Sequence, residues 1–352
     1  MKQSPYQINL VGWQSWSDTR RPTGSYPQRY FSPFHQDNLI NYHPVRSKPQ
    51  RRTAPTGWCS WHYFGTHITE QIILNQIKAA AELGLEFILI DDGWTTWGDW
   101  LFADKNKFPH GLKWLVKKIK LNGLKAGLWW APLLAKSSSG LFHQHPDWFV
   151  QNLEGTQVSP LDIFIPDKRR ILDLENPGVI AYLNQVLDYF SDSGFELLKS
   201  DFLYAAHFNP KFTSGAVPDN LLKRLLSTVH RRSFYSIACG CPLVPAIGVV
   251  DAIRISDDIN IPQLNHLWPL NHIVVSQRIS QLSANLESRL LTQPLWHLDP
   301  DAFISDPLLG INPSQSEKLV QLIQKSNGVI FLGDDLTSLT SPQSDLIGRL
   351  IN

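Results

Sequence analysis

The sequence predicts a closed (β/α)8 barrel of the TIM type, preceded by an irregular N-terminal segment. From Thr53 onward, short β-branched or aromatic runs that end in small or acidic residues alternate with amphipathic runs. Eight strand-then-helix units in order are what a closed parallel barrel requires. The main alternative, a doubly wound open sheet, usually begins with a glycine-rich phosphate-binding turn, and the chain has no G-x-G-x-x-G or Walker motif. We therefore divide the 352 residues into an irregular segment, 1–52, and a barrel, 53–352.

Each unit of the predicted barrel is a short apolar strand followed by an amphipathic helix. We expect strands at 54–59, 86–90, 124–130, 196–200, 234–239, 252–256, 294–298 and 328–332. We expect helices at 69–83, 111–121, 178–193, 218–231, 244–250, 268–285 and 314–325, with a last helical pattern at the end of the chain. A long insertion, 136–176, separates the third strand from its helix. The barrel uses the chain to its end, so we expect no appended β-domain.

Composition and charge exclude several classes of function. Lys and Arg number 32 against 31 Asp and Glu, a balance that argues against binding to nucleic acid. No apolar run reaches the roughly 18 residues that span a bilayer, and the first residues lack the apolar core of a secretory signal. We therefore expect a cytoplasmic protein without a membrane partner. The three cysteines, Cys59, Cys239 and Cys241, are too few for a disulfide framework and poorly spaced for zinc.

Charged, acidic and aromatic residues gather at the ends of the predicted strands. Function in such a barrel belongs to the C-terminal ends of the strands. These ends carry Asp91, Asp92, Trp129, Trp130, Lys199, Asp201, Cys239, Arg254, Asp258, Asp299 and Asp301. A single Asp after a strand is more often a turn residue or a helix cap than a catalytic group. Because the net charge is near zero, so many carboxylates at one face indicate an active site.

Spacing within the strands adds chemistry to this face. Side chains two apart on a strand share a face, so Lys199 and Asp201 should both point into the barrel mouth. There the ammonium group should lower the pKa of Asp201 and keep this carboxylate ionised. Two carboxylates with aromatic walls suit cleavage of a glycosidic bond, in which one is the ionised nucleophile and the other a protonated general acid.

A divalent metal site is the alternative use of an acidic rim. Asp91, Asp92, Asp201 and Asp258 could supply oxygen ligands. The neighbouring Lys199 and Arg254 fit poorly in a cation cage. Most of the histidines fall in predicted helices or loops, where we expect solvated or capping roles. We therefore expect neither a metal nor another cofactor.

Several motifs, taken together, resemble glycoside hydrolase family 36. They are GWCSWHYFGTHITE, LEFILIDDGWTTWGDW, KFPHGLKWL, GLKAGLWWAP, ELLKSDFLYAA, ACGCPLVPAIGVVDAIRISDD and LWHLDPD, in the family's order. The resemblance covers roughly residues 53–335. It implies a retaining α-galactosidase, and the RxSDD form at 254–258 is shared with plant relatives that make or degrade raffinose-type sugars.

The resemblance implies a role for each matching position. Asp201 would be the nucleophile and Asp258 the general acid and base. Asp91 and Asp92 would bind the axial 4-hydroxyl and the 6-hydroxyl of galactose, and Trp129 would lie against the apolar face of the sugar.

Further positions would complete the sugar site. Lys199 and Arg254 would hold hydroxyls and orient the nucleophile through charge-assisted hydrogen bonds. Cys239 would lie near the 2-hydroxyl, and Trp58 of the first strand would also contribute to the pocket.

The chain departs from the family in its N-terminal part. Family members usually carry an N-terminal β-sandwich, which contributes an aromatic residue to the sugar site, and a C-terminal β-domain. Here the segment GWQSW, with Trp13 and Trp16, resembles the piece that reaches the pocket, so we expect Trp16 to lie over the barrel mouth. A homo-oligomer is compatible with this arrangement. Two other functions stay open: a transglycosylase that passes galactose to another sugar, and a barrel that binds sugar without turnover.

Overall fold

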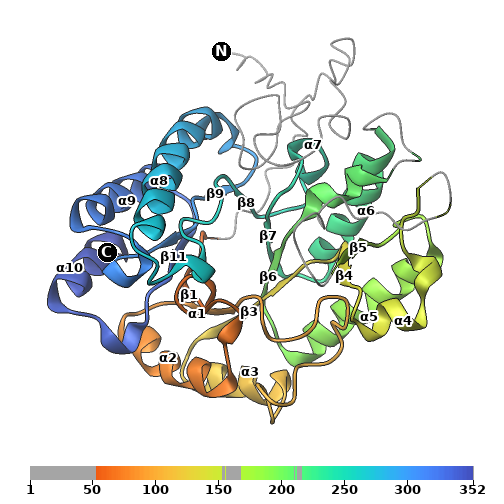
Figure 1. The fold of residues 1–352 in the computed structure, drawn as a ribbon, viewed down its shortest axis with the longest axis horizontal. Helices are drawn as coiled ribbons and strands as arrows, with labels where there is room; N and C mark the ends of the chain where they lie inside the picture. The colour runs from red at the N-terminus through yellow and green to blue at the C-terminus, as the bar shows by residue number, and fades with distance from the viewer. Residues whose placement is uncertain (1–52, 153–154, 156–167, 210, 212–215, 352) are drawn as a thin grey trace, which may run out of the picture.

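The computed structural model describes residues 53–152, 155, 168–209, 211 and 216–351. The expected placement of segment 1–52 over the barrel mouth, with Trp13 and Trp16, lies outside the described residues. Within the described residues the chain folds into one barrel surrounded by helices (Figure 1).

The centre of the fold is a sheet whose neighbouring strands all run parallel. In sheet order its strands are β10 (Ala302–Phe303), β11 (Ile330–Leu332), β1 (Thr56–Cys59), β2 (Phe87–Ile90), β3 (Lys125–Trp130), β6 (Leu197–Ser200), β7 (Tyr235–Ala238), β8 (Ala252–Arg254) and β9 (His297–Asp299). The strands β9 and β10 follow each other closely in the chain and together act as one strand of the barrel. Because β9 pairs with β8 and β10 pairs with β11, they close the sheet. Backbone hydrogen bonds from Val329 N to Leu298 O (3.0 Å) and from Gly333 N to Phe303 O (2.8 Å) complete the ring. The predicted (β/α)8 barrel is confirmed.

Helices form the outer layer of the barrel (Figure 1). The longer ones are α2 (Glu70–Glu82), α3 (Leu112–Leu121), α5 (Pro177–Ser193), α6 (Ala216–Arg231), α8 (Leu270–Arg289), α9 (Pro313–Ser326) and α10 (Ser341–Ile351). Three short helices lie in the connections between successive strands: α1 (Trp61–Phe64), α4 (Gly140–Gln144) and α7 (Leu243–Ala246).

The helix boundaries follow from local chemistry. The hydroxyl of Thr69 accepts a hydrogen bond from Ile72 N (3.2 Å) and caps α2. Helix α5 ends at Gly194, whose φ of 92° lies in the left-handed region that glycine adopts without strain. Such caps explain why most predicted helices begin and end within a few residues of the observed ones.

The core has two layers. A large apolar cluster lies between the strands and the helices, and a smaller one fills the barrel interior, where it includes Phe87, Leu197, Ile237 and Phe331. The interior is therefore packed, and a site for a small molecule must lie at one end of the barrel.

The sequence misplaced the seventh strand. We expected it at 294–298, whereas β9 covers His297–Asp299 and β10 follows at Ala302–Phe303. Pro294 and Pro300 have no N–H to donate to a strand ladder, which explains the late start and the interruption. The fifth helix is also shorter than the expected 244–250, because α7 ends at Ala246.

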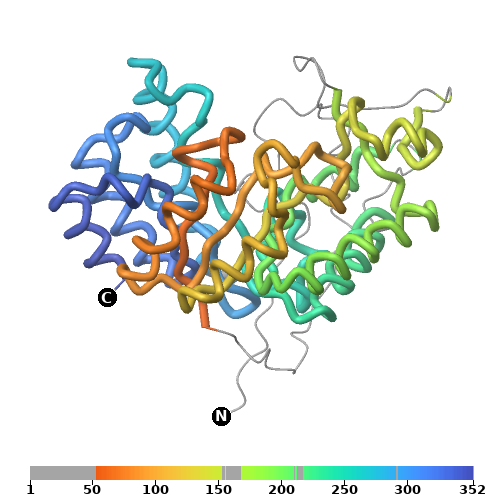
Figure 2. The backbone as a smooth tube through the Cα atoms, turned by 90° about the horizontal axis from the view of Figure 1, so that it is seen from below, coloured from red at the N-terminus to blue at the C-terminus, as the bar shows by residue number. Residues whose placement is uncertain are grey.

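The insertion after the third strand carries structure that the sequence did not reveal. Strands β4 (Leu134–Lys136) and β5 (Arg169–Ile171) pair antiparallel, and α4 lies between them in sequence. In the side view of Figure 2, the segment after β1 and the loop between β8 and α8 rise at the same end of the barrel. This end, formed by the C-terminal ends of the strands, is the barrel mouth. None of the described helices combines the length and apolar character needed to cross a membrane.

Candidate active site

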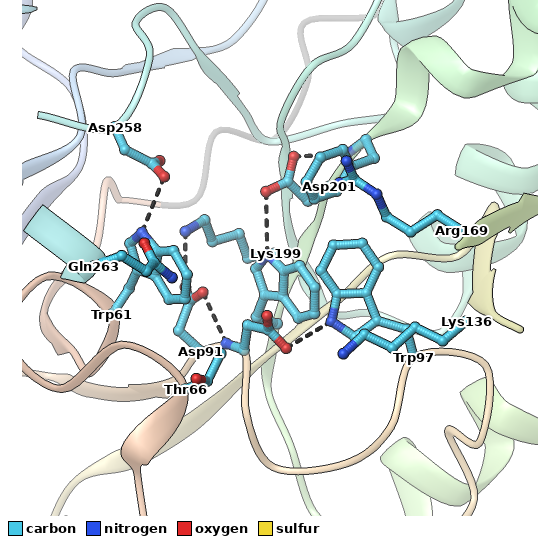
Figure 3. A pocket seen from close by; sticks show the side chains of 13 residues that line it. Trp61, Thr66, Asp91, Trp97, Lys136, Arg169, Lys199, Asp201, Asp258 and Gln263 are labelled. Atoms are coloured by element: carbon cyan, nitrogen blue, oxygen red, sulfur yellow. Dashed lines mark hydrogen bonds and ion pairs between the residues drawn. The ribbon is translucent and has the colours of Figure 1, made fainter. Parts of the chain in front are cut away.

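The barrel mouth holds a cavity of about 260 Å³. Its wall consists of Trp61, Thr66, Asp91, Asp92, Trp97, Trp129, Lys136, Arg169, Lys199, Asp201, Phe202, Asp258 and Gln263. Figure 3 shows how these side chains converge from the ends of several strands and the loops that follow them. The volume lies just below the lower end of the range for small-molecule sites, about 300 Å³, and suits one sugar ring better than a long chain.

Asp91, directly after β2, forms a buried ion pair at the bottom of the cavity. Its Oδ2 lies 2.7 Å from Lys199 Nζ of β6, and both side chains are buried. Cys59 donates from Sγ to the same oxygen (3.4 Å), and the backbone N–H of Asp91 donates to the hydroxyl of Ser60 (2.9 Å). The expected face of Lys199 is therefore right, but its ion-pair partner is Asp91.

Asp92, the next residue in the chain, also lines the cavity. Trp97 donates its indole N–H to Asp92 Oδ1 at 2.7 Å (Figure 3). Burial raises the pKa of Asp92 to about 6, although the hydrogen bond from Trp97 and the charge of Lys136 act against this rise. A carboxyl that changes charge near neutral pH therefore lines the cavity.

Asp201, directly after β6, is held by two N–H donors. Trp129 donates to Oδ2 (3.1 Å), and the backbone N–H of Phe202 donates to Oδ1 (2.6 Å). Phe202 adopts a φ of 56°, which is uncommon for an aromatic residue and marks a sharp turn of the backbone directly after Asp201.

The pKa of Asp201 is raised, which corrects the expectation that Lys199 keeps it low. Burial is the largest cause; Lys199 acts in the opposite direction, and the charge of Asp258 raises the pKa further. The ammonium group is closely paired with Asp91, which explains why its effect on Asp201 does not prevail.

Asp258, beyond β8, is the most accessible of these carboxylates, with 44% of its side chain exposed. Trp61 of α1 donates its indole N–H to Oδ2 (2.9 Å), and Arg254 Nη2 lies 3.0 Å from Oδ1. The loop between β8 and α8 and the short helix after β1 therefore position this group together (Figure 3).

Three predicted site residues do not line the cavity. Trp58 is fully buried in the core, where its indole N–H donates to Asp334 O (2.8 Å). Cys239 is buried beside the strand that precedes Asp201, with its N–H donating to Ser200 O (2.8 Å). Arg254 is buried and reaches the cavity only through Asp258.

Other residues line the cavity without having been predicted. Trp97 packs against Trp129 and Phe202, with ring centroids 5.3 and 5.1 Å apart. The guanidinium of Arg169 lies 5.6 Å from the ring centroids of both Trp97 and Phe202. Trp61 follows the first strand by only two residues, so the strand-end rule could have favoured it over Trp58.

The cavity can hold a small polar ring against its indole groups. Two ionisable carboxylates then face the bound molecule. Two of the carboxylates that the metal hypothesis needs, Asp91 and Asp258, have cationic partners. In the part of the chain that the structure describes, no three His, Cys, Asp or Glu side chains are grouped so that they could hold a metal ion.

Comparison with known proteins identifies a family for this chain. The family model described as Melibiase matches residues 29–206. Alpha-galactosidase 2 of Pediococcus pentosaceus is 32% identical over 158 residues, which are 40% of this chain and 21% of the relative. Alpha-galactosidase AgaA of Geobacillus stearothermophilus is 36% identical over 97 residues, 25% of this chain and 13% of the relative.

Solved structures resemble the chain over a greater length. TtGalA, an alpha-galactosidase from Thermus thermophilus solved with stachyose, superposes with a TM-score of 0.74 at 25% identity, covering 86% of this chain and 66% of that one. AgaA from Geobacillus stearothermophilus, described as a GH36 alpha-galactosidase, gives a TM-score of 0.63 at 18% identity over 85% of this chain and 41% of its own. The alignments thus span about a fifth or less of the two curated relatives.

Proposed function

Because the chain belongs to the Melibiase family, in line with its resemblance to glycoside hydrolase family 36, we propose that it cleaves terminal α-galactosyl residues from galactosides and retains the anomeric configuration. The substrate would be an α-galactoside oligosaccharide or a simpler galactoside. The reaction needs two carboxyl groups and no cofactor.

One observation carries this proposal: Asp201 and Asp258 line one cavity but lie in different surroundings. Asp201 is buried and held by two N–H groups, whereas Asp258 is partly exposed between an indole and a guanidinium. A pair of carboxyls that act as nucleophile and as acid and base needs such different environments.

The proposed reaction has two steps. Asp201 attacks the anomeric carbon while Asp258 gives its proton to the leaving oxygen, which forms a covalent glycosyl-enzyme. Asp258 then takes a proton from water, and the resulting oxygen nucleophile attacks the anomeric carbon and releases Asp201. The donors from Trp129 and Phe202 fix the carboxylate of Asp201 for attack, and Trp61 and Arg254 hold Asp258 beside the leaving group.

The remaining polar groups would recognise the sugar. We assign Asp91 and Asp92 to the axial 4-hydroxyl and the 6-hydroxyl, with Lys199 as a donor to a neighbouring hydroxyl. Trp129 would pack on the apolar face of the ring. A site built for hydroxyls rejects a sugar whose hydroxyl points elsewhere, since its buried polar groups are then left unpaired.

The first test is release of nitrophenol from the α-galactoside, with the α-glucoside and the α-N-acetylgalactosaminide as controls, each with and without chelator. We expect selective cleavage of the galactoside that chelator does not change, with α-galactose as the first product by NMR. β-Galactose as the first product would refute retention, and loss of activity with chelator would favour the metal hypothesis. A galactosylated acceptor formed with excess sugar would indicate transfer, and saturable binding without product would indicate a binding barrel.

A second test addresses the carboxylate roles. Asp201→Ala should abolish turnover, and added azide should restore bond cleavage by entering the space of the missing carboxylate and forming the β-galactosyl azide. Asp188→Asn, an exposed carboxylate of α5 paired with Arg232, serves as the control and should keep full activity. Turnover by Asp201→Ala without azide would require another nucleophile.

Two further parts of the proposal concern the whole chain. We propose a cytoplasmic location, which fractionation of the producing cell would test. We also propose that Trp16 completes the sugar site. Trp16→Ala should then raise KM for the galactoside, whereas an unchanged KM would remove this residue from the site.

A further inference from the structure

His62 of α1 is a fully buried histidine outside the cavity wall. Its Nδ1 lies 2.7 Å from Asn260 Oδ1, and its Nε2 lies 3.0 Å from Asp301 Oδ1. The sequence predicted solvated or capping roles for the histidines of predicted helices and loops, so a buried and doubly bonded ring is a correction. His62 and Asp301 are both buried, so an ion pair between them has to be explained. Removing ions from water is costly unless they are well paired.

The hydrogen bonds around His62 determine its charge. Asn260 donates its amide N–H groups to the carbonyl oxygen of His62 (3.0 Å) and to Asn265 Oδ1 (2.9 Å), so its own Oδ1 must be the acceptor that faces Nδ1. Asn265 donates to the same carbonyl oxygen (2.9 Å). The carboxylate of Asp301 is also an acceptor. Both ring nitrogens therefore donate, and only the imidazolium form carries two N–H groups.

Asp301 connects His62 to the acid and base of the proposed reaction. Arg254 Nη2 lies 2.7 Å from Asp301 Oδ1 and 3.0 Å from Asp258 Oδ1, so one guanidinium nitrogen serves two carboxylates. The second oxygen of Asp301 accepts the backbone N–H of Ile259 at 2.6 Å. Asp301 has a φ of 81°, in the left-handed region that Asp tolerates better than most residues.

The geometry points to His62 as a positioning residue that neutralises Asp301, so that the charge of Arg254 remains available to hold Asp258. This role rests on the proposed function, in which Asp258 is the general acid and base. Consistent with it, the charge and hydrogen bond of Asp301 raise the pKa of His62 against the opposing effect of burial. Arg254 and His62 in turn hold the pKa of Asp301 well below its usual range, although burial acts in the other direction.

The other groups near this chain of contacts come from several elements. Asp258 also faces Trp61 of α1 and interacts with Asp201 after β6. Arg254 also interacts with Asp299 of β9, and it lowers the pKa of Arg278 on α8. Asp301 also donates its backbone N–H to Asp299 Oδ1 (3.0 Å), and its charge interacts with Arg278. Among the described residues, the donors to its carboxylate are His62, Arg254 and the backbone N–H of Ile259.

The experiment compares His62→Gln with the double variant His62→Gln/Asp301→Asn and with His110→Gln. His110 is the matched control, because it pairs with Glu70 at 2.7 Å but is 59% exposed and lies outside the cavity wall. Removing the His62 charge leaves Asp301 to compete for Arg254, so Asp258 should hold its proton to higher pH. We expect the basic limb of the kcat/KM profile to move up by about 0.5–1 pH unit in His62→Gln.

Two features separate this effect from simple structural damage. Adding Asp301→Asn removes the anion that His62 neutralised and should bring the basic limb back toward the wild-type position. If the substitutions only damaged the fold, the double variant would instead depart further from wild type than the single one. KM should change by less than about twofold, since His62 does not line the cavity. His110→Gln should leave both limbs unmoved.

A second readout does not depend on catalysis. The indole proton resonance of Trp61 reports the protonation of Asp258 directly, and its titration should move with the same signs in the same variants. If wild-type protein cleaves no galactoside, the proposed function fails while this titration still decides the role of His62. An unchanged midpoint of the Trp61 titration in His62→Gln would overturn the inference. A midpoint that lies further from wild type in the double variant than in the single variant would overturn it as well.

The unmodified protein provides the test if His62→Gln does not fold. In a ¹⁵N spectrum at neutral pH, both ring nitrogens of His62 should resonate as protonated nitrogens. One unprotonated ring nitrogen would show a neutral imidazole and refute the assignment.

Discussion

Asp92→Asn should stabilise the fold at pH 8 while it removes a group proposed to bind substrate. Burial raises the pKa of Asp92 from the ordinary 3.8 to about 6, so the ionised form is disfavoured in the folded protein. A shift of about two pKa units corresponds to about 3 kcal/mol as an upper limit. Because the carboxyl faces an open cavity, screening by solvent reduces this value to about 1–2 kcal/mol.

The sign of the effect depends on pH in a defined window. Below the unfolded pKa of about 3.9, Asp92 is largely protonated in both states and its shift costs no stability. As pH rises through about 6, the folded protein must ionise a buried carboxyl, and stability is lost. Asparagine keeps the acceptor oxygen for Trp97 and carries no charge, so it removes this loss at pH 8 and changes little at pH 4.

Thermal unfolding of both proteins at the two pH values measures the difference. For 352 residues, 1–2 kcal/mol corresponds to a rise in Tm of about 1–3 °C. Asp188→Asn, on the exposed face of α5, should change Tm by less than about 1 °C at either pH. An equal rise at pH 4 and pH 8, or no rise at pH 8, would refute the electrostatic reasoning.

Three other outcomes follow from the site and the core. The acidic limb of kcat/KM should lie above the usual carboxyl range near pH 3.9, because burial raises the pKa of Asp201 and activity is lost as this group gains a proton; a limb below pH 3.5 would contradict the assignment. Trp61→Phe removes the indole donor to Asp258 and should lower kcat/KM by about 10- to 100-fold, measured at the optimum pH. Gly57→Ala should destabilise the fold by about 1–3 kcal/mol in thermal unfolding, since a Cβ there would lie 2.6 Å from the ring of Phe331 and 2.8 Å from Phe87 O. Gly348→Ala, in open space on α10, is the control and should not destabilise.

The sequence by itself determined the order of strands and helices and the end of the barrel that holds the site. Periodicity and caps are local, so residues such as Thr69 and Gly194 placed helix ends without any knowledge of the fold. In a parallel barrel all strand ends meet at one face. This rule predicted that Asp91, Asp92, Asp201 and Asp258 lie at the same face, and all four line the cavity.

Tertiary structure decided which groups pair. The alternation along β6 placed Lys199 on the correct face, but only the sheet order, in which β3 alone separates β2 from β6, brought Asp91 to it as its partner. Tertiary contacts also decided between Trp58 and Trp61. Trp58 lies within the strand and enters the core, whereas Trp61, three positions later, reaches Asp258.

The contacts of His62 could not be read from the sequence at all. Asp301 lies 239 positions away from it and Asn260 lies 198 positions away. Secondary-structure patterns extend over a few residues, whereas the charge of a buried group depends on every donor and acceptor within a few ångströms, whatever their separation along the chain. The order of strands and helices therefore depends on local sequence. The charge states and ion pairs of the site depend on contacts that form only in the folded barrel.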